Sequence, residues 1–281
     1  MSVITIGGKK VGIVNSTVSG VKTFQGFKRS GDVRFSLSGN KYVQEAIDAF
    51  NLYSKYGSNK VSDTKLVTEH LTYFLHAFDI ISGHEGGFDS YNTYDAGGLS
   101  LGTIQFALTS NILIKMLNEM ENGLGDEVNK LFTNKGPFVE DIDLTNRLNK
   151  EICEKILNVS STSKSIQIQL KYVIQQFYDE SYSLFLSLVK PKIKIENGNN
   201  LFVYANAFMF DRKVNKGDLE PFNEKNLALI PKDVFTEGTF IYKMSAGGPV
   251  KLNLPVRDAY WNGVNPGGPF GKNFIEGNLP S

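Results

Sequence analysis

The chain is poor in the residues that form disulfides or bind metal ions. Of its 281 residues one is cysteine, Cys153, and three are histidines, His70, His76 and His84. A lone cysteine excludes a disulfide within the chain, and these residues do not show the spacing of a zinc site. We therefore expect the protein to need neither a metal ion nor an organic cofactor.

Long apolar runs and a surplus of charge of one sign are also missing. No stretch of about eighteen consecutive apolar residues occurs, which argues against a membrane-spanning helix. Lysine and arginine number 30 against 29 aspartates and glutamates, for a net charge of +1. Because this balance gives no general attraction to a polyanion, we expect no nucleic-acid partner and no membrane partner.

The first residues, MSVITIGGKK, lack the charged start, apolar block and small-residue cleavage site of a signal peptide. We expect synthesis in the cytoplasm without a Sec signal. Any action outside the cell would then follow lysis, delivery on a virion or secretion by another route.

Composition divides the chain into three parts. Residues 1–40 alternate short β-like runs with glycine and serine, which predicts a β-rich N-terminal arm. Residues 41–230 have mainly helical periodicity and predict the principal domain. Residues 231–281 are rich in glycine, proline and asparagine, and we expect an irregular C-terminal extension packed on that domain. The expected fold class is mainly α (α+β).

Apolar residues three and four positions apart predict several helices in the principal domain. The first covers roughly residues 41–57, and a second begins after Asp63, a favourable N-cap, and ends at Gly83. The same periodicity occurs over residues 107–121, 141–158, 164–189 and 201–215. Residues 86–103 are too rich in glycine, asparagine and aspartate for a helix and predict a small β-hairpin or an irregular loop.

Potentially catalytic residues concentrate in the segment from Gly83 to Ala107, GHEGGFDSYNTYDAGGLSLGTIQFA. Glu85 falls just past the predicted end of the second helix, which can hold the carboxyl group in place. The negative end of the helix dipole favours the protonated carboxyl group over the carboxylate. A general acid requires a proton of this kind.

A second carboxyl group, that of Asp95, follows ten residues later in a segment that should turn back toward the helix end. Two carboxyl groups facing each other across a cleft can cleave a glycosidic bond. Ser100 adds a hydroxyl group that can hold the attacking water. Gln105 adds an amide that can bind sugar hydroxyls or an N-acetyl group.

Glycines and aromatic residues make up much of the remaining segment. Gly86–Gly87, Gly97–Gly98 and Gly102 permit tight turns and leave space for a polymer beside the backbone. The aromatic residues offer flat faces on which sugar rings stack, and they are Phe88, Tyr91, Tyr94 and Phe106. The segment therefore predicts one wall of a saccharide-binding cleft.

The order of these residues also resembles a known pattern. The segment contains, in order, Glu85-Gly86-Gly87-Phe88, Tyr91-Asn92, Asp95, Gly97-Gly98, Ser100, Gly102 and Gln105-Phe106. This arrangement resembles the active-site segment of lysozyme-like peptidoglycan hydrolases. Residues 211–217, with the pattern D-x-x-V-N-x-G, are similar to a helix end that occurs late in several such hydrolases. The resemblance covers roughly residues 64–217.

The resemblance implies a lysozyme-like helical domain with a small β-hairpin insertion. It also implies a glycoside hydrolase that cleaves the β-1,4 glycan of peptidoglycan or a related amino-sugar polymer. Glu85 would be the acid, Asp95 the second carboxylate and Ser100 the hydroxyl group that positions water. We expect substrate contacts from five residues, Tyr91, Asn92, Tyr94, Gln105 and Phe106.

Several of these residues also have plainer explanations. Asp95 precedes Ala-Gly-Gly and is a natural turn former, Ser100 could end a strand, and Gln105 could cap the following helix. The same carboxyl groups would also suit a chitosanase-like or chitinase-like enzyme. A third alternative is a non-catalytic glycan-binding or structural module of a phage tail or secretion apparatus. In either setting the N-terminal arm could dock onto such an assembly.

Overall fold

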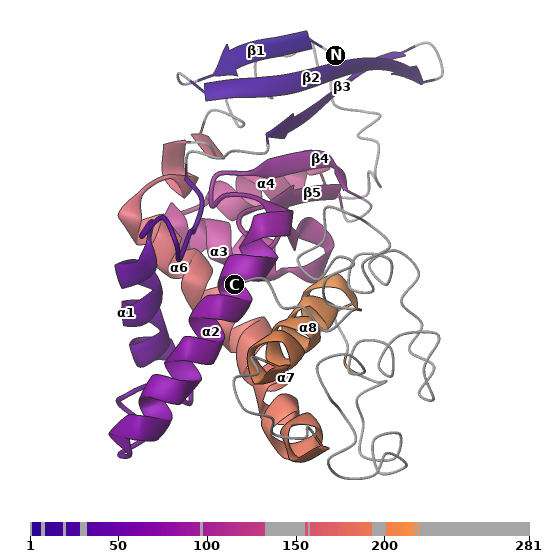
Figure 1. Ribbon diagram of the computed structural model, residues 1–281. Coiled ribbons are helices and arrows are strands. Elements are labelled where there is room, and N and C mark those ends of the chain that lie inside the picture. Colours follow the sequence, from indigo (N-terminus) through magenta and orange to yellow (C-terminus); the bar gives the residue numbers. More distant parts are fainter. Residues whose placement is uncertain are drawn as a thin grey trace. The chain divides into compact units, whose positions relative to one another are not determined.

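The computed structural model describes residues 2–6, 9–18, 21–28, 33–95, 98–132, 155–156, 158–192, 201–216 and 219. Within these ranges the protein is mainly helical, with one antiparallel sheet (Figure 1). No helix among the described residues is long and apolar enough to span a bilayer. The predicted C-terminal extension, 231–281, lies outside the described residues.

The chain divides into two compact units. Unit 1 comprises Met1–Tyr53 and Ser82–Ile174, and unit 2 comprises Ser54–Ile81 and Gln175–Ser281. The chain passes between the units after Tyr53, after Ile81, which lies inside the long helix α2 (Thr64–Glu85), and after Ile174. The whole predicted active-site segment, from Gly83 to Ala107, therefore belongs to unit 1.

The sheet belongs to unit 1 and has the strand order β1-β2-β3-β4-β5-β6. The strands are β1 (Ser2–Ile6), β2 (Lys9–Val18), β3 (Val21–Lys28), β4 (Tyr91–Asp95), β5 (Gly98–Leu101) and β6 (Phe106–Ala107). Every neighbouring pair is antiparallel. Through the pairing of β3 with β4, the strands β1 to β3 share one sheet with the predicted hairpin, and the division of the chain at residue 40 stays a prediction.

Unit 1 also contains four longer helices among its described residues. They are α1 (Val43–Tyr53), α3 (Ile112–Met120), α4 (Leu124–Phe132) and α6 (Ser163–Val173). α6 packs against α1 and α3, and α3 packs against α4. Each helix contributes fully buried apolar side chains, among them Phe50, Met116, Val128 and Leu170. Removal of these side chains from water is the main stabilising contribution to such a core.

Unit 2 has an aromatic core. It contains the first part of α2 and two π-helical segments, η2 (Ile174–Tyr178), whose first residue still belongs to unit 1, and η3 (Phe185–Val189). The helices α7 (Asp179–Leu184) and α8 (Leu201–Lys216) and the 3₁₀ turn η4 (Lys190–Lys192) complete its described elements. Fully buried aromatic residues of α2, the π segments, α7 and α8 pack edge-to-face or stacked, and they are Phe74, Tyr178, Tyr182, Phe185 and Phe210.

Two polar contacts lie beside the aromatic core of unit 2. His70 Nδ1 lies 2.6 Å from the hydroxyl oxygen of the buried Tyr182. The carboxylate of Asp179 accepts hydrogen bonds from Ser54 Oγ at 2.7 Å and from the backbone N–H of Lys55 at 2.9 Å. These bonds hold residues 54–55 against the start of α7.

Most of the predicted helices are confirmed where the structure describes them. α1 lies within the predicted 41–57. The predicted segment 107–121 contains the 3₁₀ turn η1 (Leu108–Ser110) followed by α3, the segment 164–189 covers most of α6 to η3, and 201–215 corresponds to α8. Of the predicted 141–158, only residues 155, 156 and 158 are described, and all are helical. α4 is a helix that the sequence pattern did not predict.

Asp63 is the N-cap of α2 as predicted, because its Oδ1 accepts hydrogen bonds from Lys65 N at 2.9 Å and Leu66 N at 3.3 Å. The predicted end of this helix at Gly83 is wrong by two residues. Helical structure continues to Glu85, and the left-handed conformation occurs at Gly86, with φ of 127°. Glycine adopts that conformation without a steric penalty, whereas Gly83 simply remains helical.

Candidate active site

The candidate active site begins at the C-terminal end of α2. Glu85 is the last residue of the helix and is half-buried, and Gly86 donates a backbone hydrogen bond to the carbonyl of Ser82 at 3.1 Å. The hydroxyl of the buried Ser90 accepts a hydrogen bond from Gly87 N at 2.7 Å. A side chain at Gly86 would lie 2.5 Å from that hydroxyl. Glycine and serine together therefore fix the direction in which the backbone leaves Glu85.

The strands β4 and β5 form the hairpin that follows. Tyr91 pairs with Leu101, Asn92 with Ser100, and Asp95 with Gly98, with an irregularity in the register between Asn92 and Asp95. Asp95 is thus the last residue of β4, about 13 Å of extended strand beyond Tyr91. The side chains of Asn92, Tyr94 and Asp95 lie outside the described residues. Their predicted roles as second carboxylate and substrate contacts remain predictions.

Ser100 and Gln105 are brought together. The hydroxyl of the buried Ser100 donates a hydrogen bond to Gln105 Oε1 at 2.9 Å, and Gln105 Nε2 donates to the carbonyl of Gly102 at 3.0 Å. Gln105 has a φ of 54°, a left-handed conformation that costs a non-glycine residue about 1 to 3 kcal/mol. Strained residues of this kind cluster at functional sites. The pair therefore forms a fixed polar unit at the end of β5.

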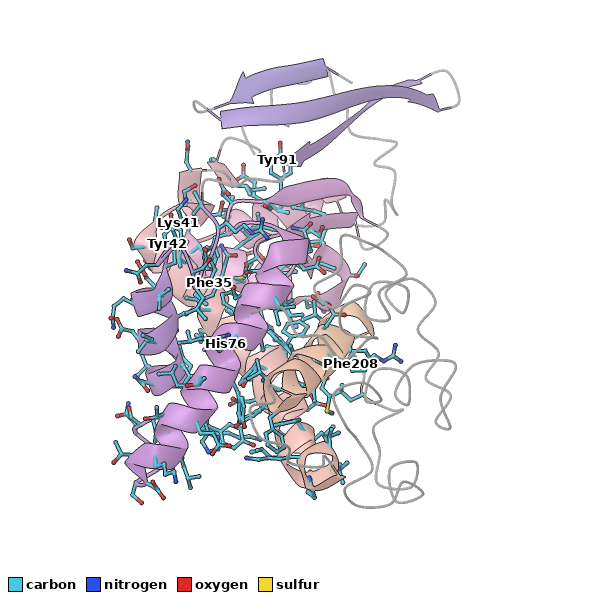
Figure 2. All side chains as sticks on the ribbon, viewed as in Figure 1. Phe35, Lys41, Tyr42, His76, Tyr91 and Phe208 are labelled. Atoms are coloured by element: carbon cyan, nitrogen blue, oxygen red, sulfur yellow. The ribbon has the colours of Figure 1, made fainter. Side chains whose placement is uncertain are left out.

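Tyr91 and Phe106 occupy different surroundings from those predicted. Tyr91, labelled in Figure 2, is 1% exposed, and Phe106 is 3% exposed. Each is paired in the sheet with Leu101, Tyr91 across β4–β5 and Phe106 across β5–β6. Because so little ring surface is exposed, neither side chain offers a face on which a sugar ring can stack. Both are buried core residues, and so is Phe88, whose fully buried ring packs edge-to-face on Tyr42.

A further residue of the site, Gln169 on α6, was not predicted from the sequence. Its side chain is fully buried, its Nε2 donates a hydrogen bond to the carbonyl of Phe88 at 2.8 Å, and its Oε1 accepts one from Thr103 N at 3.3 Å. The sequence did carry a signal. Gln169 lies three residues after Ile166 and four before Val173, so it occupies an apolar face of the helix, where a glutamine must find buried partners.

A hydrogen bond between backbone groups also joins the segments around Phe88 and Thr103. Gly102 N donates to the carbonyl of Ser90 at 2.7 Å. A Cβ atom at Gly102 would lie 2.2 Å from Gln169 Oε1, and Gly102 has a φ of 87°. Glycine is therefore required at this position both by its conformation and by the close approach of the glutamine amide.

Among the described residues, no group of three or more histidine, cysteine, aspartate and glutamate side chains could hold a metal ion. Asp211, which begins the second pattern noted in the sequence, is 3% exposed on α8 of unit 2. This burial indicates a structural role for its carboxyl group. No protein-family model, curated protein or solved structure matches the chain.

Proposed function

We propose that the protein is a lysozyme-like glycoside hydrolase that cleaves the β-1,4 glycan of peptidoglycan. The observation that carries the proposal is the order of groups along one continuous path in unit 1. A glutamate at the very end of a helix is followed by a glycine with positive φ, and then by the hairpin with Asp95 and the Ser100–Gln105 pair. A rigid helix, a fixed turn and a strained polar residue are features that favour catalysis over a solvated surface loop.

In the proposed reaction Glu85 donates its proton to the oxygen of the glycosidic bond as that bond breaks. A water molecule attacks the anomeric carbon from the opposite side, and Asp95 accepts the proton that this water loses. We assign the positioning of this water to Ser100: its hydroxyl proton is directed to Gln105, and its fully buried oxygen could accept a hydrogen bond only from a water enclosed in the site. This route inverts the anomeric centre and corresponds to a carboxyl separation of roughly 6.5 to 9.5 Å.

The test is the clearing of purified peptidoglycan by Glu85→Gln. The amide of glutamine has the same shape as the acid but cannot deliver a proton, so the initial rate of turbidity loss should fall by about 10² to 10⁴-fold. Glu121→Gln is the matched control, because Glu121 is also a helix-end glutamate, at the C-cap of α3, and is exposed. The control should clear at the wild-type rate.

An equal rate for wild type and Glu85→Gln would refute the assignment of Glu85. A wild-type protein that binds peptidoglycan without releasing soluble fragments would instead support the non-catalytic alternative. Running the same assay on chitosan and chitin separates the polymers. Faster release of soluble fragments from chitosan or chitin than from peptidoglycan would instead support the chitosanase-like or chitinase-like alternative.

We also propose that the enzyme reaches the cell wall after lysis, on a virion or through a non-Sec secretion machine. Residues 1–40 would dock onto such an assembly. Support comes from the placement of this region in the sheet, since β1 lies at the end of the strand order, where one edge has no partner strand among the described residues.

A further inference from the structure

Gln169 connects the two backbone segments that carry the proposed catalytic groups. Its donor group binds the carbonyl of Phe88, three residues after Glu85, and its acceptor group binds the N–H of Thr103, two residues before Gln105. The amide of Gln169 therefore fixes the spacing between the helix end and the turn after β5.

The position would be occupied by an apolar residue if packing were its only role. The flanking residues Ile168 and Leu170 are buried and apolar, and α6 packs against α1 and α3. A buried amide costs free energy unless both of its polar groups are bonded, so it brings no advantage to packing alone. Two satisfied bonds to two separate segments give the amide a directional role that leucine or methionine cannot have.

We infer that Gln169 is a positioning residue of the candidate active site. It holds the turn with the Ser100–Gln105 pair at a fixed place relative to the backbone that follows Glu85. The inference rests on the proposed function for its catalytic consequence. In catalysis a displacement of about 1 Å can cost about 10²-fold in rate, even when the displaced group is remote from the chemistry.

The experiment compares Gln169→Met with Gln167→Met in the full chain. Methionine is close to glutamine in length and volume but can form neither of the two hydrogen bonds. Gln167 lies on the same helix and is exposed, so its replacement controls for the change of residue type and for helix propensity. Circular dichroism is used to check that both variants are folded at the assay temperature.

Two measurements are made on each variant. The first is the initial rate of peptidoglycan clearing as a function of substrate concentration, which separates kcat from KM. For Gln169→Met we expect kcat to fall by about 10 to 10²-fold with KM changed by less than about threefold, because geometry at the reacting bond is altered rather than substrate binding. Gln167→Met should match the wild type in both constants.

The second measurement is hydrogen exchange of the backbone amides in residues 86–92 and 99–107. The N–H of Thr103 is itself the donor to Gln169, so its exchange should be at least about tenfold faster in Gln169→Met and unchanged in Gln167→Met. Equal exchange in the two variants would overturn the inference. Equal kcat in the two variants would overturn its catalytic part.

Gln169→Glu provides a third comparison, because a positioning role predicts a pH dependence of kcat that a purely structural role would not produce. The protonated acid has one donor and one acceptor and can replace the amide, whereas the carboxylate has no donor for the carbonyl of Phe88. The kcat of this variant relative to wild type should be severalfold higher at about pH 5 than at about pH 8, with the folded fraction checked at each pH. A ratio that does not change with pH in the folded protein would count against positioning by Gln169.

The two proposals can fail separately. If the wild-type protein does not clear peptidoglycan, or if Glu85→Gln clears it normally, the proposed function fails, while the exchange measurement still decides whether Gln169 fixes the turn. If Glu85→Gln is inactive but Gln169→Met behaves as Gln167→Met does, the proposed function stands and the role of Gln169 is refuted.

Discussion

Replacement of Gly102 by alanine should destabilise the protein far more than the same change at Gly123. Both glycines have a positive φ, 87° and 82°, so each alanine carries a backbone cost of about 1 to 2 kcal/mol. At Gly123 nothing lies within 4 Å of the new Cβ atom. At Gly102 the Cβ atom would lie 2.2 Å from Gln169 Oε1. The two substitutions therefore differ by the contact with the glutamine.

The size of that difference follows from the hydrogen bonds that the side chain of Gln169 must break. Its Oε1 is the end of a side chain, so the amide can move away from the alanine, but only by breaking its bonds to Thr103 N and the carbonyl of Phe88. Each buried group left without a partner costs about 1 to 3 kcal/mol. Gly102→Ala should thus cost about 2 to 6 kcal/mol beyond Gly123→Ala, a large part of the roughly 5 to 15 kcal/mol that keeps a typical domain folded.

Urea unfolding followed by circular dichroism measures both changes. A double-mutant cycle identifies the cause, because in the background of Gln169→Ala the new Cβ atom at residue 102 no longer meets the amide. In that background Gly102→Ala should cost no more than Gly123→Ala costs in the wild type. An equal cost for the two glycines, or a cost at Gly102 that is independent of Gln169, would refute the reasoning.

Further outcomes are expected for polar groups in the two units. Thr103 Oγ1 is buried and has no hydrogen-bond partner among the described residues, so Thr103→Val should raise the free energy of unfolding by about 1 kcal/mol. Thr162→Val should lower it by about 1 kcal/mol, because Thr162 Oγ1 caps α6 by accepting a hydrogen bond from Ser165 N. Thermal unfolding of both variants checks that the two changes have opposite signs. Burial lowers the pKa of His70 from its ordinary value of 6.5, against the opposing charge of Glu69. The unfolded state then binds the proton more readily, so stability is fully present above about pH 6.5 and decreases as the pH falls toward the folded-state pKa. His70→Phe should reduce the change of the free energy of unfolding with pH, measured by urea titrations at several pH values. An unchanged pH dependence would contradict the assignment to His70.

Local signals in the sequence predicted the helices well and their ends less well. The i, i+3, i+4 periodicity located α1, α3, α6 and α8, and Asp63 marked the start of α2. The end of α2 was placed at the first glycine, Gly83, although the conformation that ends the helix occurs at Gly86. The choice between the two depends on Ser90, whose hydroxyl occupies the space that a side chain at residue 86 would need.

The helix α4 was not predicted because Gly123 and Gly125 flank its first residue and resemble a loop. The structure gives the second glycine a packing role, since a Cβ atom at Gly125 would lie 2.1 Å from the carbonyl oxygen of Ile114. Close contact between α3 and α4 therefore requires a glycine that propensity alone would count against a helix. Such tertiary contacts are not encoded in a short window of sequence.

The order of the candidate residues was visible in the sequence, but their spatial organisation was not. Glu85, Ser100 and Gln105 were chosen from their order along one segment; the structure brings Ser100 and Gln105 into contact, and the catalytic roles of all three stay predictions. Gln169 is distant in sequence, and a single glutamine among apolar residues has no distinctive pattern. Tyr91 and Phe106 were predicted as exposed platforms because residue type shows that a ring is present but not which way the strand turns it.

The pairing of β3 with β4 has a consequence for shortened forms of the protein. Phe27 pairs with Asn92 and Lys28 with Tyr91, so β3 covers one edge of β4 at its first two residues. A version that starts after residue 28 would expose the backbone N–H and C=O groups of β4 to other chains, and such open edges promote self-association. Loss of activity in that version would therefore not by itself show that the N-terminal region recruits a partner. A cut after β1 would keep β3 paired with β4 and would only make β2 the edge strand in place of β1, so it tests the N-terminal region without uncovering β4.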